Sequence, residues 1–276
     1  MRSILSKYSN LTQRIIAALI GAIIIVGSLI SGMWYFFIVF LAIGVVTQLE
    51  FYKLVGLDGM LPLKTYGTIC GIFLFTLSFL IESGQIEARY YALIFPVVAC
   101  VYLIYLYRKQ VSKPFRGIAF TFLGIIYVMV PFSLLNVVIF EPGAYTFILV
   151  LGSMLILWSN DTGAYFTGVQ FGRRKLFERV SPKKSWEGFV GGLLFSIGMS
   201  LLIDHYTDVL QSWQWISIAF IISIGGTYGD LVESLFKRSI EIKDSGRLIP
   251  GHGGFLDRFD GLLLSVPFIV AFLKIF

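Results

Sequence analysis

The stretch IIAALIGAIIIVGSLISGMWYFFIVFLAIGVVTQL, residues 15–49, carries no charged side chain over 35 positions. As one α-helix it would be about 52 Å long, whereas the hydrocarbon core of a bilayer is about 30 Å thick. The stretch therefore predicts two membrane-spanning helices with a turn at Ser31-Gly32. Composition agrees, because a chain that is 57% hydrophobic and only 14% charged cannot cover its apolar surface with polar side chains.

Apolar runs long enough to span a membrane recur along the rest of the chain. The further expected spans are residues 65–81, 90–107, 117–140, 144–160, 186–203, 214–230 and 261–276. Together with the first two they make nine, which predicts an all-α, polytopic integral membrane protein. Pro131 lies inside the span 117–140, so we expect that helix to tilt or kink.

The distribution of Lys and Arg predicts the orientation. If the N-terminus is cytoplasmic, nine spans place 20 of the 22 basic residues on the cytoplasmic side, and only Arg89 and Lys274 fall outside it. Such a bias in short segments sets membrane topology. It also accounts for most of the net charge of +6, so we expect no nucleic-acid partner. The cytoplasmic segments are residues 1–14, 50–64, 108–116, 161–185 and 231–260.

Two parts of the chain are distinguished by this layout. Residues 1–140 hold the first five spans, and residues 141–276 hold four spans with the longest polar segments, 161–185 and 231–260. Function is expected in these two segments. Cys70 and Cys100 both fall inside apolar runs, and two separated cysteines form neither a zinc site nor a disulfide framework.

The segment KRSIEIKDSGRLIPGHGGFLDRFDG, residues 237–261, is dense in mixed charge and glycine. From Asp230 to Gly261 six acids oppose five bases, whereas a patch that only binds anionic lipid would be mainly basic. Carboxylates at Asp230 and Asp257, where spans end, are costly unless paired or bound to a cation. This pattern indicates a divalent cation held by carboxylates, with bases left for phosphates. The alternative is a solvated surface loop, in which His252 is a structural hydrogen-bonding residue.

The second polar segment, SNDTGAYFTGVQFGRRKLFERVSPKKSWEG at residues 159–188, is net basic. Six bases against three acids between Asp161 and Glu187 suit polyphosphate or anionic head groups. Two alternatives stay open here. Asn160-Asp161 is also a plausible helix cap, and part of the basic charge is the signal for cytoplasmic location.

These residues resemble the signature of the phosphatidate cytidylyltransferase family, also called CDP-diacylglycerol synthases. The match runs without a gap through Ser234, Lys237-Arg238, Lys243-Asp244, Pro250-Gly251-His252-Gly253-Gly254, Asp257-Arg258 and Asp260. Upstream, Asn160-Asp161, Ala164-Tyr165-Phe166 and residues 181–188 resemble the family's other blocks. Ser185 replaces an expected Thr and keeps the hydroxyl, whereas residues 1–140 resemble the family only as membrane spans.

The resemblance implies that CTP and phosphatidate react to give CDP-diacylglycerol and pyrophosphate. It also implies Mg²⁺ dependence, with the possibility of a second cation, and a homodimer in the bacterial inner membrane whose active site faces the cytoplasm. Asp230 and Asp257 match the family's metal-holding aspartates, and their positions at the membrane edge had indicated the same two.

The remaining site residues are assigned on the same basis. Lys237, Arg247 and His252 are candidates for phosphate contacts, and Gly253 and Gly254 for backbone donors. Asp244 and Asp260 complete the catalytic set. The other expected substrate-binding residues are Asn160, Asp161, Lys183, Lys184, Ser234, Arg238, Lys243 and Arg258.

Two rival classes of function remain open on the sequence. A related enzyme would use another lipid phosphate, such as an isoprenoid or ether lipid, or would transfer a sugar phosphate. A transporter is the non-enzyme alternative, although its usual mark is charge within the spans. Here the charges cluster at one expected face of the membrane.

Overall fold

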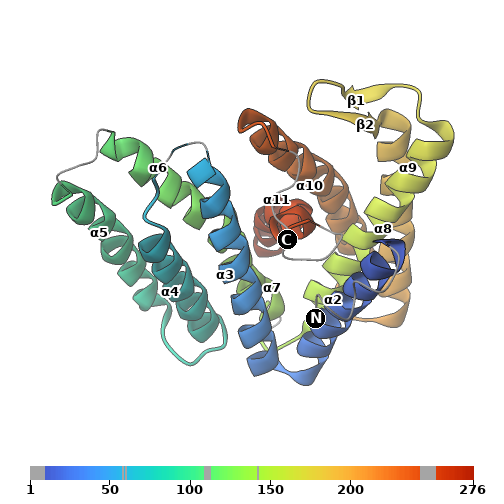
Figure 1. The fold of residues 1–276 in the computed structure, drawn as a ribbon. Helices are drawn as coiled ribbons and strands as arrows, with labels where there is room; N and C mark the ends of the chain where they lie inside the picture. The colour runs from blue at the N-terminus through green and yellow to red at the C-terminus, as the bar shows by residue number, and fades with distance from the viewer. Residues whose placement is uncertain (1–9, 58, 60, 109–112, 142, 243–252) are drawn as a thin grey trace. The chain divides into compact units, whose positions relative to one another are not determined.

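The computed structural model describes residues 10–57, 59, 61–108, 113–141, 143–242 and 253–276. These residues are overwhelmingly helical (Figure 1), which confirms the predicted all-α class. The chain forms two compact units. One comprises residues 1–137 and 244–258, the other residues 138–243 and 259–276.

The first unit begins with two helices separated by a single residue. α2 spans Asn10–Ser31 and α3 spans Met33–Leu57. Gly32 lies between them with φ of 119°, a conformation that glycine adopts without steric cost. The predicted turn at Ser31-Gly32 is therefore confirmed. The unit continues with α4 (Lys64–Glu82), the 3₁₀ helix η1 (Ala88–Leu93), α5 (Ile94–Leu106) and α6 (Pro114–Gly124).

Aromatic side chains fill the contact between α3 and α4. Phe36, Phe40, Phe75 and Phe79 are fully buried, and the Phe36 and Phe40 ring centroids are 4.6 Å apart. Tyr52 is also fully buried, and its hydroxyl donates a hydrogen bond of 2.8 Å to the carbonyl oxygen of Thr121 on α6. Because the polar tip of Tyr52 is satisfied, this ring can fill the core without leaving an orphaned hydroxyl.

The helix after α6 departs from α geometry just before its proline. The π-helical turn η2 spans Ile125–Met129, and α7 spans Val130–Ile139. Pro131 lacks an N–H and cannot bond to the preceding turn, and inserted π turns are a common way for a helix to absorb such a break. A π turn thus precedes Pro131, and the expected tilt or kink of this helix stays a prediction.

The second unit packs α8, α9 and α10 together, with a small hairpin between α8 and α9 (Figure 1). α8 spans Phe147–Phe171, so Asn160 and Asp161 lie inside the helix and the alternative helix-cap interpretation is wrong. The antiparallel strands β1 (Lys175–Phe177) and β2 (Ser181–Ser185) follow. α9 spans Trp186–Tyr206, α10 spans Ser212–Ser239, and α11 spans Leu256–Ile275.

Ser185 ends β2 and caps α9. Its side-chain oxygen accepts a hydrogen bond of 3.1 Å from the backbone N–H of Gly188. The first N–H groups of a helix have no partner within it, and a hydroxyl in this position satisfies one of them. The Ser that replaces an expected Thr therefore still performs the capping role of a hydroxyl.

Within the described residues, seven helical segments are long and apolar enough to cross a membrane. They are Met33–Leu57, Lys64–Glu82, Ala88–Leu106, Pro114–Ile139, Phe147–Phe171, Trp186–Tyr206 and Ser212–Ser239. A shorter apolar helical stretch, Ile16–Ser31, lies in α2. α11 carries Asp257, Arg258, Asp260 and Lys274 and is not among the seven. Helices stand at all nine expected positions, and the count of nine spans stays a prediction.

Candidate functional site

Glycines on α10 allow α11 to approach it closely. A Cβ atom added at Gly229 would collide with the carbonyl oxygen of Asp260, and one added at Gly225 would lie 2.5 Å from the Ser265 hydroxyl. Gly261 lies opposite Gly226 in the same contact. Small residues let two helix backbones meet at short range. The glycines of the sequence GGTYGD, residues 225–230, therefore place the middle of α10 against the beginning of the apolar part of α11.

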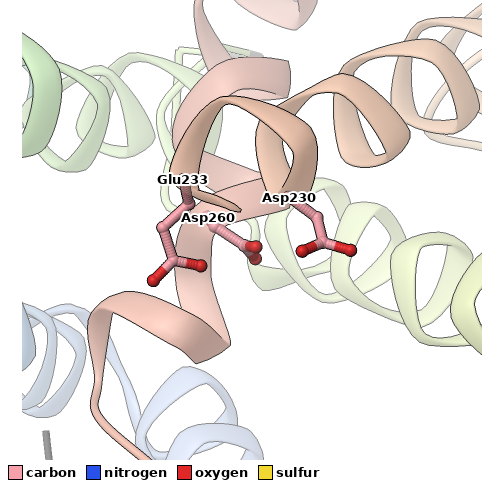
Figure 2. Close-up of side chains that lie close together, drawn as sticks. All are labelled: Asp230, Glu233 and Asp260. Atoms are coloured by element: carbon pink, nitrogen blue, oxygen red, sulfur yellow. The ribbon is translucent and has the colours of Figure 1, made fainter. Parts of the chain in front are cut away.

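Three carboxylates gather at this contact (Figure 2). Asp230 and Glu233 extend from successive turns of α10, and Asp260 extends from α11. One carboxylate oxygen from each lies within 4.8 Å of the other two. Glu233 is only 1% exposed, whereas Asp230 and Asp260 are partly buried. Three ionised acids this close together repel one another, which favours either a compensating positive charge or protonation of one carboxyl group.

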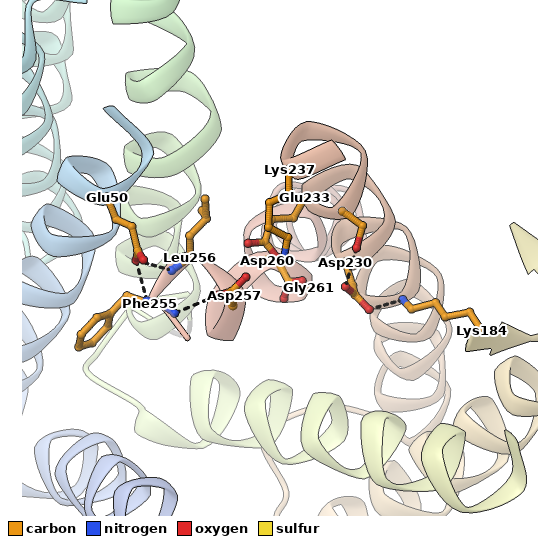
Figure 3. Close-up of polar contacts among 12 residues, drawn as sticks. Glu50, Lys184, Asp230, Glu233, Lys237, Phe255, Leu256, Asp257, Asp260 and Gly261 are labelled. Carbon is orange, nitrogen blue, oxygen red and sulfur yellow. Dashed lines mark hydrogen bonds and ion pairs between the residues drawn. The ribbon is translucent and has the colours of Figure 1, made fainter. Parts of the chain in front are cut away.

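Two lysines supply part of that charge. The Lys184 ammonium, on β2, lies 2.7 Å from the Asp230 carboxylate (Figure 3). It also donates a hydrogen bond of 2.9 Å to the carbonyl oxygen of Thr227. The Lys237 ammonium lies 3.3 Å from the Glu233 carboxylate, one helical turn away on α10. With all three acids ionised, the three carboxylates and two ammonium groups would leave one net negative charge at the cluster.

The electrostatics of Asp260 reflect this crowding. Asp260 precedes the apolar stretch of α11, and the backbone N–H of Gly261 donates a hydrogen bond of 2.7 Å to its carboxylate. Desolvation, followed by the negative charge of Asp230, raises the pKa of Asp260 to about 7. The charge of Asp161 acts in the same direction. A bound cation would favour the ionised carboxyl, so the cluster has the electrostatic character of a cation site.

The donor set also fits a divalent cation by type and spacing. Carboxylate oxygens are the ligands that Mg²⁺ prefers, and two oxygens on opposite sides of a Mg²⁺ ion are about 4.2 Å apart. The three carboxylate oxygens lie within 4.8 Å of one another. A small rotation of one carboxylate would bring this separation to the value expected around Mg²⁺. Asp230, Glu233 and Asp260 are thus able to hold one divalent ion.

The structure also places the two expected residues on α8. Asn160 is 3% exposed, and its side-chain oxygen accepts a hydrogen bond of 3.4 Å from the Ser196 hydroxyl on α9. Asp161 follows it and is exposed. The negative charge of Asp161 contributes to the raised pKa of Asp260, so Asp161 interacts electrostatically with the cluster.

The glycine-rich turn before α11 belongs to the first unit, together with Asp257. Gly253 has φ of 81°, and the backbone N–H of Gly254 donates a hydrogen bond of 2.9 Å to the Asp257 carboxylate (Figure 3). A first-turn acid that accepts from an N–H preceding the helix is one half of the capping-box arrangement. Asp257 thus stabilises the turn that precedes its own helix. The predicted metal role of Asp257 stays a prediction.

The remaining expected residues divide into two groups. The Ser234 hydroxyl donates a hydrogen bond of 3.4 Å to Asp230, so it adjoins the cluster. Lys183, Arg238 and Arg258 have exposed side chains on β2, α10 and α11 respectively. The predictions for Lys243, Asp244, Arg247 and His252 fall outside the described residues.

Two acids in the structure were not assigned to the site from sequence. Glu233 was visible on the helix face shared with Asp230, and that spacing alone was the available signal. Glu50 is 4% exposed on α3, and its carboxylate accepts hydrogen bonds from the backbone N–H groups of Phe255 at 2.7 Å and Leu256 at 3.1 Å (Figure 3). Glu50 directly follows the uncharged stretch 15–49, and an acid at the end of a span was the signal that could have identified it.

The fold and the carboxylate cluster together define a class: a polytopic α-helical membrane protein with a polar, cation-compatible site where α10 meets α11. The chain belongs to the cytidylyltransferase family, whose model matches residues 12–276.

Bacterial relatives are similar along nearly the whole chain. A phosphatidate cytidylyltransferase of Staphylococcus saprophyticus is 31% identical over 264 residues, which cover 95% of this chain and 97% of the relative. One from Bacillus subtilis is 31% identical over 273 residues, covering 97% and 99%. One from Staphylococcus aureus is 39% identical over 156 residues, covering 56% and 58%.

Proposed function

We propose that this protein is a CTP:phosphatidate cytidylyltransferase that forms CDP-diacylglycerol and pyrophosphate. The observation that carries the proposal is the cluster of Asp230, Glu233 and Asp260 with two lysines, in a chain whose family model covers residues 12–276. The names of relatives that align over nearly the full length support the choice of substrates.

The proposed chemistry is a single displacement at phosphorus. A phosphate oxygen of phosphatidate attacks the α-phosphorus of CTP, a new P–O bond forms, and the bond from the α-phosphorus to the bridging oxygen of the β-phosphate breaks. Pyrophosphate leaves with that electron pair. Because the attacking phosphate is already an anion at pH 7, no strong general base is required, and positioning and charge neutralisation supply most of the catalysis.

Each part of the site has a role in this scheme. Asp230, Glu233 and Asp260 would hold the cation, and we include Asp257, which precedes Asp260 by three residues in α11. A divalent cation supplies charge neutralisation at phosphate oxygens. Lys184 and Lys237, now paired with carboxylates, would bind the phosphates, because an ammonium group can exchange a carboxylate partner for a phosphate oxygen. The apolar helices would leave the acyl chains of phosphatidate in the bilayer.

The proposal also covers the cofactor, the assembly and the location. Mg²⁺ is the expected cation, and a second cation is compatible with four carboxylates. We propose a homodimer in the bacterial inner membrane, with the site on the cytoplasmic face. The charge distribution supports this orientation, because 20 of 22 basic residues fall in the segments assigned to that side. Chemical cross-linking of the purified protein in membranes, read as a doubled mass on a denaturing gel, would test the dimer.

A substrate panel tests the assignment of the lipid. The purified protein is incubated with Mg²⁺, one of the four nucleoside triphosphates, and either phosphatidate, an isoprenoid phosphate or an ether-lipid phosphate. We expect transfer only from CTP (or its deoxy form) and mainly to phosphatidate. Faster transfer to an isoprenoid phosphate, or no transfer to any lipid, would contradict the proposal. Proteoliposome uptake without nucleotide tests the transporter alternative, and we expect none.

A further inference from the structure

The Glu50 carboxylate binds the backbone at the beginning of α11. It accepts hydrogen bonds from the N–H groups of Phe255 and Leu256, at 2.7 and 3.1 Å, across 205 and 206 positions in the sequence. The first N–H groups of any helix lack partners within the helix. Glu50 therefore supplies, from α3, the acceptor that the N-terminus of α11 would otherwise lack.

Both ends of this contact belong to the first unit, which contains residues 1–137 and 244–258. Gly254 donates to Asp257, while Phe255 and Leu256 donate to Glu50. Three successive backbone N–H groups are thus held by two carboxylates. The turn at Gly253, with its positive φ, is fixed on one side by α3 and on the other by the first turn of its own helix.

Burying a charged acceptor such as the Glu50 carboxylate costs more free energy than capping a helix requires. Glu50 is 4% exposed, and removing a carboxylate from water costs several kcal/mol unless it is well paired. A neutral Ser or Asn caps a helix adequately. An ionised acceptor at a helix N-terminus forms shorter, stronger hydrogen bonds and also interacts favourably with the helix dipole. We therefore expect the buried Glu50 carboxylate to hold the turn more rigidly than a neutral cap would, despite the free-energy cost of removing it from water.

We infer that Glu50 is a positioning residue for the reaction: its carboxylate on α3 fixes the Gly253–Asp257 turn so that Asp257 is presented in one orientation. The inference rests on the proposed function, because Asp257 matters to catalysis only if it takes part in the cation or phosphate site. The Glu50 carboxylate accepts hydrogen bonds from backbone N–H groups of this turn, so we expect its effect on the reaction to pass through Asp257.

The test compares full-length wild-type protein with Glu50→Ala, Glu50→Gln and a matched control, Gln48→Ala. Gln48 is also buried on α3, two residues away, but its amide donates to the Gly67 carbonyl oxygen on α4 and to the Tyr52 hydroxyl. Both alanine variants remove a buried polar side chain from the same helix. A merely structural role for Glu50 predicts that they behave alike.

Two measurements are made on each protein in detergent. The first is amide hydrogen exchange at Phe255 and Leu256. The second is the steady-state rate of CMP transfer, measured over a range of Mg²⁺ concentrations. This series gives kcat and the Mg²⁺ concentration at which the rate is half-maximal. For Glu50→Ala we expect about tenfold or faster exchange at these two amides, and a kcat lower by about 10- to 100-fold, because misplaced catalytic groups cost rates of this order. The half-maximal Mg²⁺ concentration should rise.

Glu50→Gln should fall between the wild type and Glu50→Ala, because an amide oxygen can still accept the hydrogen bonds without the charge. This near-isosteric variant keeps the test informative if Glu50→Ala fails to fold. Gln48→Ala should lower thermal stability while leaving exchange at Phe255 and Leu256, and kcat, within about threefold of the wild type.

The inference would be overturned if the Phe255 and Leu256 amides exchanged in Glu50→Ala at the same rate as in the wild type. It would also be overturned if Glu50→Ala and Gln48→Ala lost the same amount of kcat. A wild-type protein that transfers no CMP from CTP to phosphatidate would instead overturn the proposed function. Faster exchange in Glu50→Ala would then still support the contact between Glu50 and the turn.

Discussion

Asp230 lies between two kinds of partner: the Lys184 ammonium at 2.7 Å and the neighbouring carboxylates of Glu233 and Asp260. The ammonium compensates its charge, and the carboxylates make that compensation necessary. A cation that binds the cluster would take over the role of Lys184 and free it to contact a phosphate. Asp230 would thus link the two proposed tasks of the site, holding a cation and binding phosphates.

Replacing a proposed cation ligand by its amide tests this account. Asp230→Asn and Asp257→Asn should each lower Mg²⁺-dependent CMP transfer by about 100-fold or more, because a metal ion contributes several kcal/mol to charge stabilisation and each 1.4 kcal/mol is about tenfold in rate. Membrane insertion should be unchanged, as measured by recovery from the membrane fraction.

The matched control is Arg89→Ala. Arg89 is exposed and pairs with Glu87 at 2.9 Å, and exposed ion pairs contribute about 0–1 kcal/mol to stability. Its turnover should stay within about twofold of the wild type. Near-wild-type turnover in either aspartate variant would show that the metal assignment of that residue is wrong.

Residue types and spacing predicted part of this site and left part unassigned. Asp230 was expected because an acid at a span edge requires compensation, and Asp260 was expected from the family resemblance. The structure brings the two together. Glu233 lies one turn from Asp230 on α10 and was not assigned to the site. Glu50 was missed because its partners are more than 200 positions away, and no local periodicity reports such a contact.

At the scale of elements, the contact between α10 and α11 determines whether the carboxylates meet. Gly225, Gly226 and Gly229 line this contact, and no larger side chain fits at Gly229 without displacing the backbone at Asp260. The packing of two helices therefore sets the separation of Asp230 and Asp260.

Gly229→Ala should separate these elements. The added methyl group would meet the Asp260 carbonyl oxygen, and overpacking of this kind costs about 1–3 kcal/mol. We expect a lower thermal midpoint and a rate of CMP transfer reduced by about tenfold or more. Thermal unfolding in detergent and the transfer assay provide the two readings.

Gly198→Ala on α9 is the control, because no atom lies within 4 Å of a Cβ added there. An open helical site gains about 0.5–1 kcal/mol from Gly to Ala. If Gly229→Ala were as active as Gly198→Ala, the close approach of α10 and α11 would be unimportant for the site.

The sequence was a better guide to the existence of helices than to their ends. Apolar runs predicted helices at all the observed positions, because twenty or so apolar residues have few alternatives in a bilayer. α8 and α10 continue well past the apolar runs, to Phe171 and Ser239. Polar residues continue a helix where packing or solvent satisfies them, and hydropathy cannot report that continuation.

At the scale of the whole molecule, the distribution of charge supports a single orientation. The two basic residues outside the expected cytoplasmic segments both pair with acids: Arg89 with Glu87 at 2.9 Å, and Lys274 with Glu141 at 2.6 Å. Two basic residues are a much weaker topological signal than the 20 that fall in the segments assigned to the cytoplasmic side.

Single-cysteine labelling in intact cells tests this orientation. In a background of Cys70→Ala and Cys100→Ala, an impermeant maleimide should label Gln85→Cys, which is exposed between α4 and η1. It should not label Arg179→Cys, which is exposed in the hairpin between β1 and β2, until the membrane is permeabilised. The reverse pattern would show that the N-terminus and the site face the other side.

We expect the purified protein to transfer CMP from CTP to phosphatidate. The most direct measurement uses CTP labelled with ³²P at the α-phosphate, phosphatidate in mixed micelles, and Mg²⁺ or excess chelator. The account predicts that label enters the organic-soluble lipid fraction only when phosphatidate and Mg²⁺ are both present, with an equal amount of pyrophosphate released. Label that stays in the aqueous phase, or that enters lipid at the same rate with chelator, would contradict it.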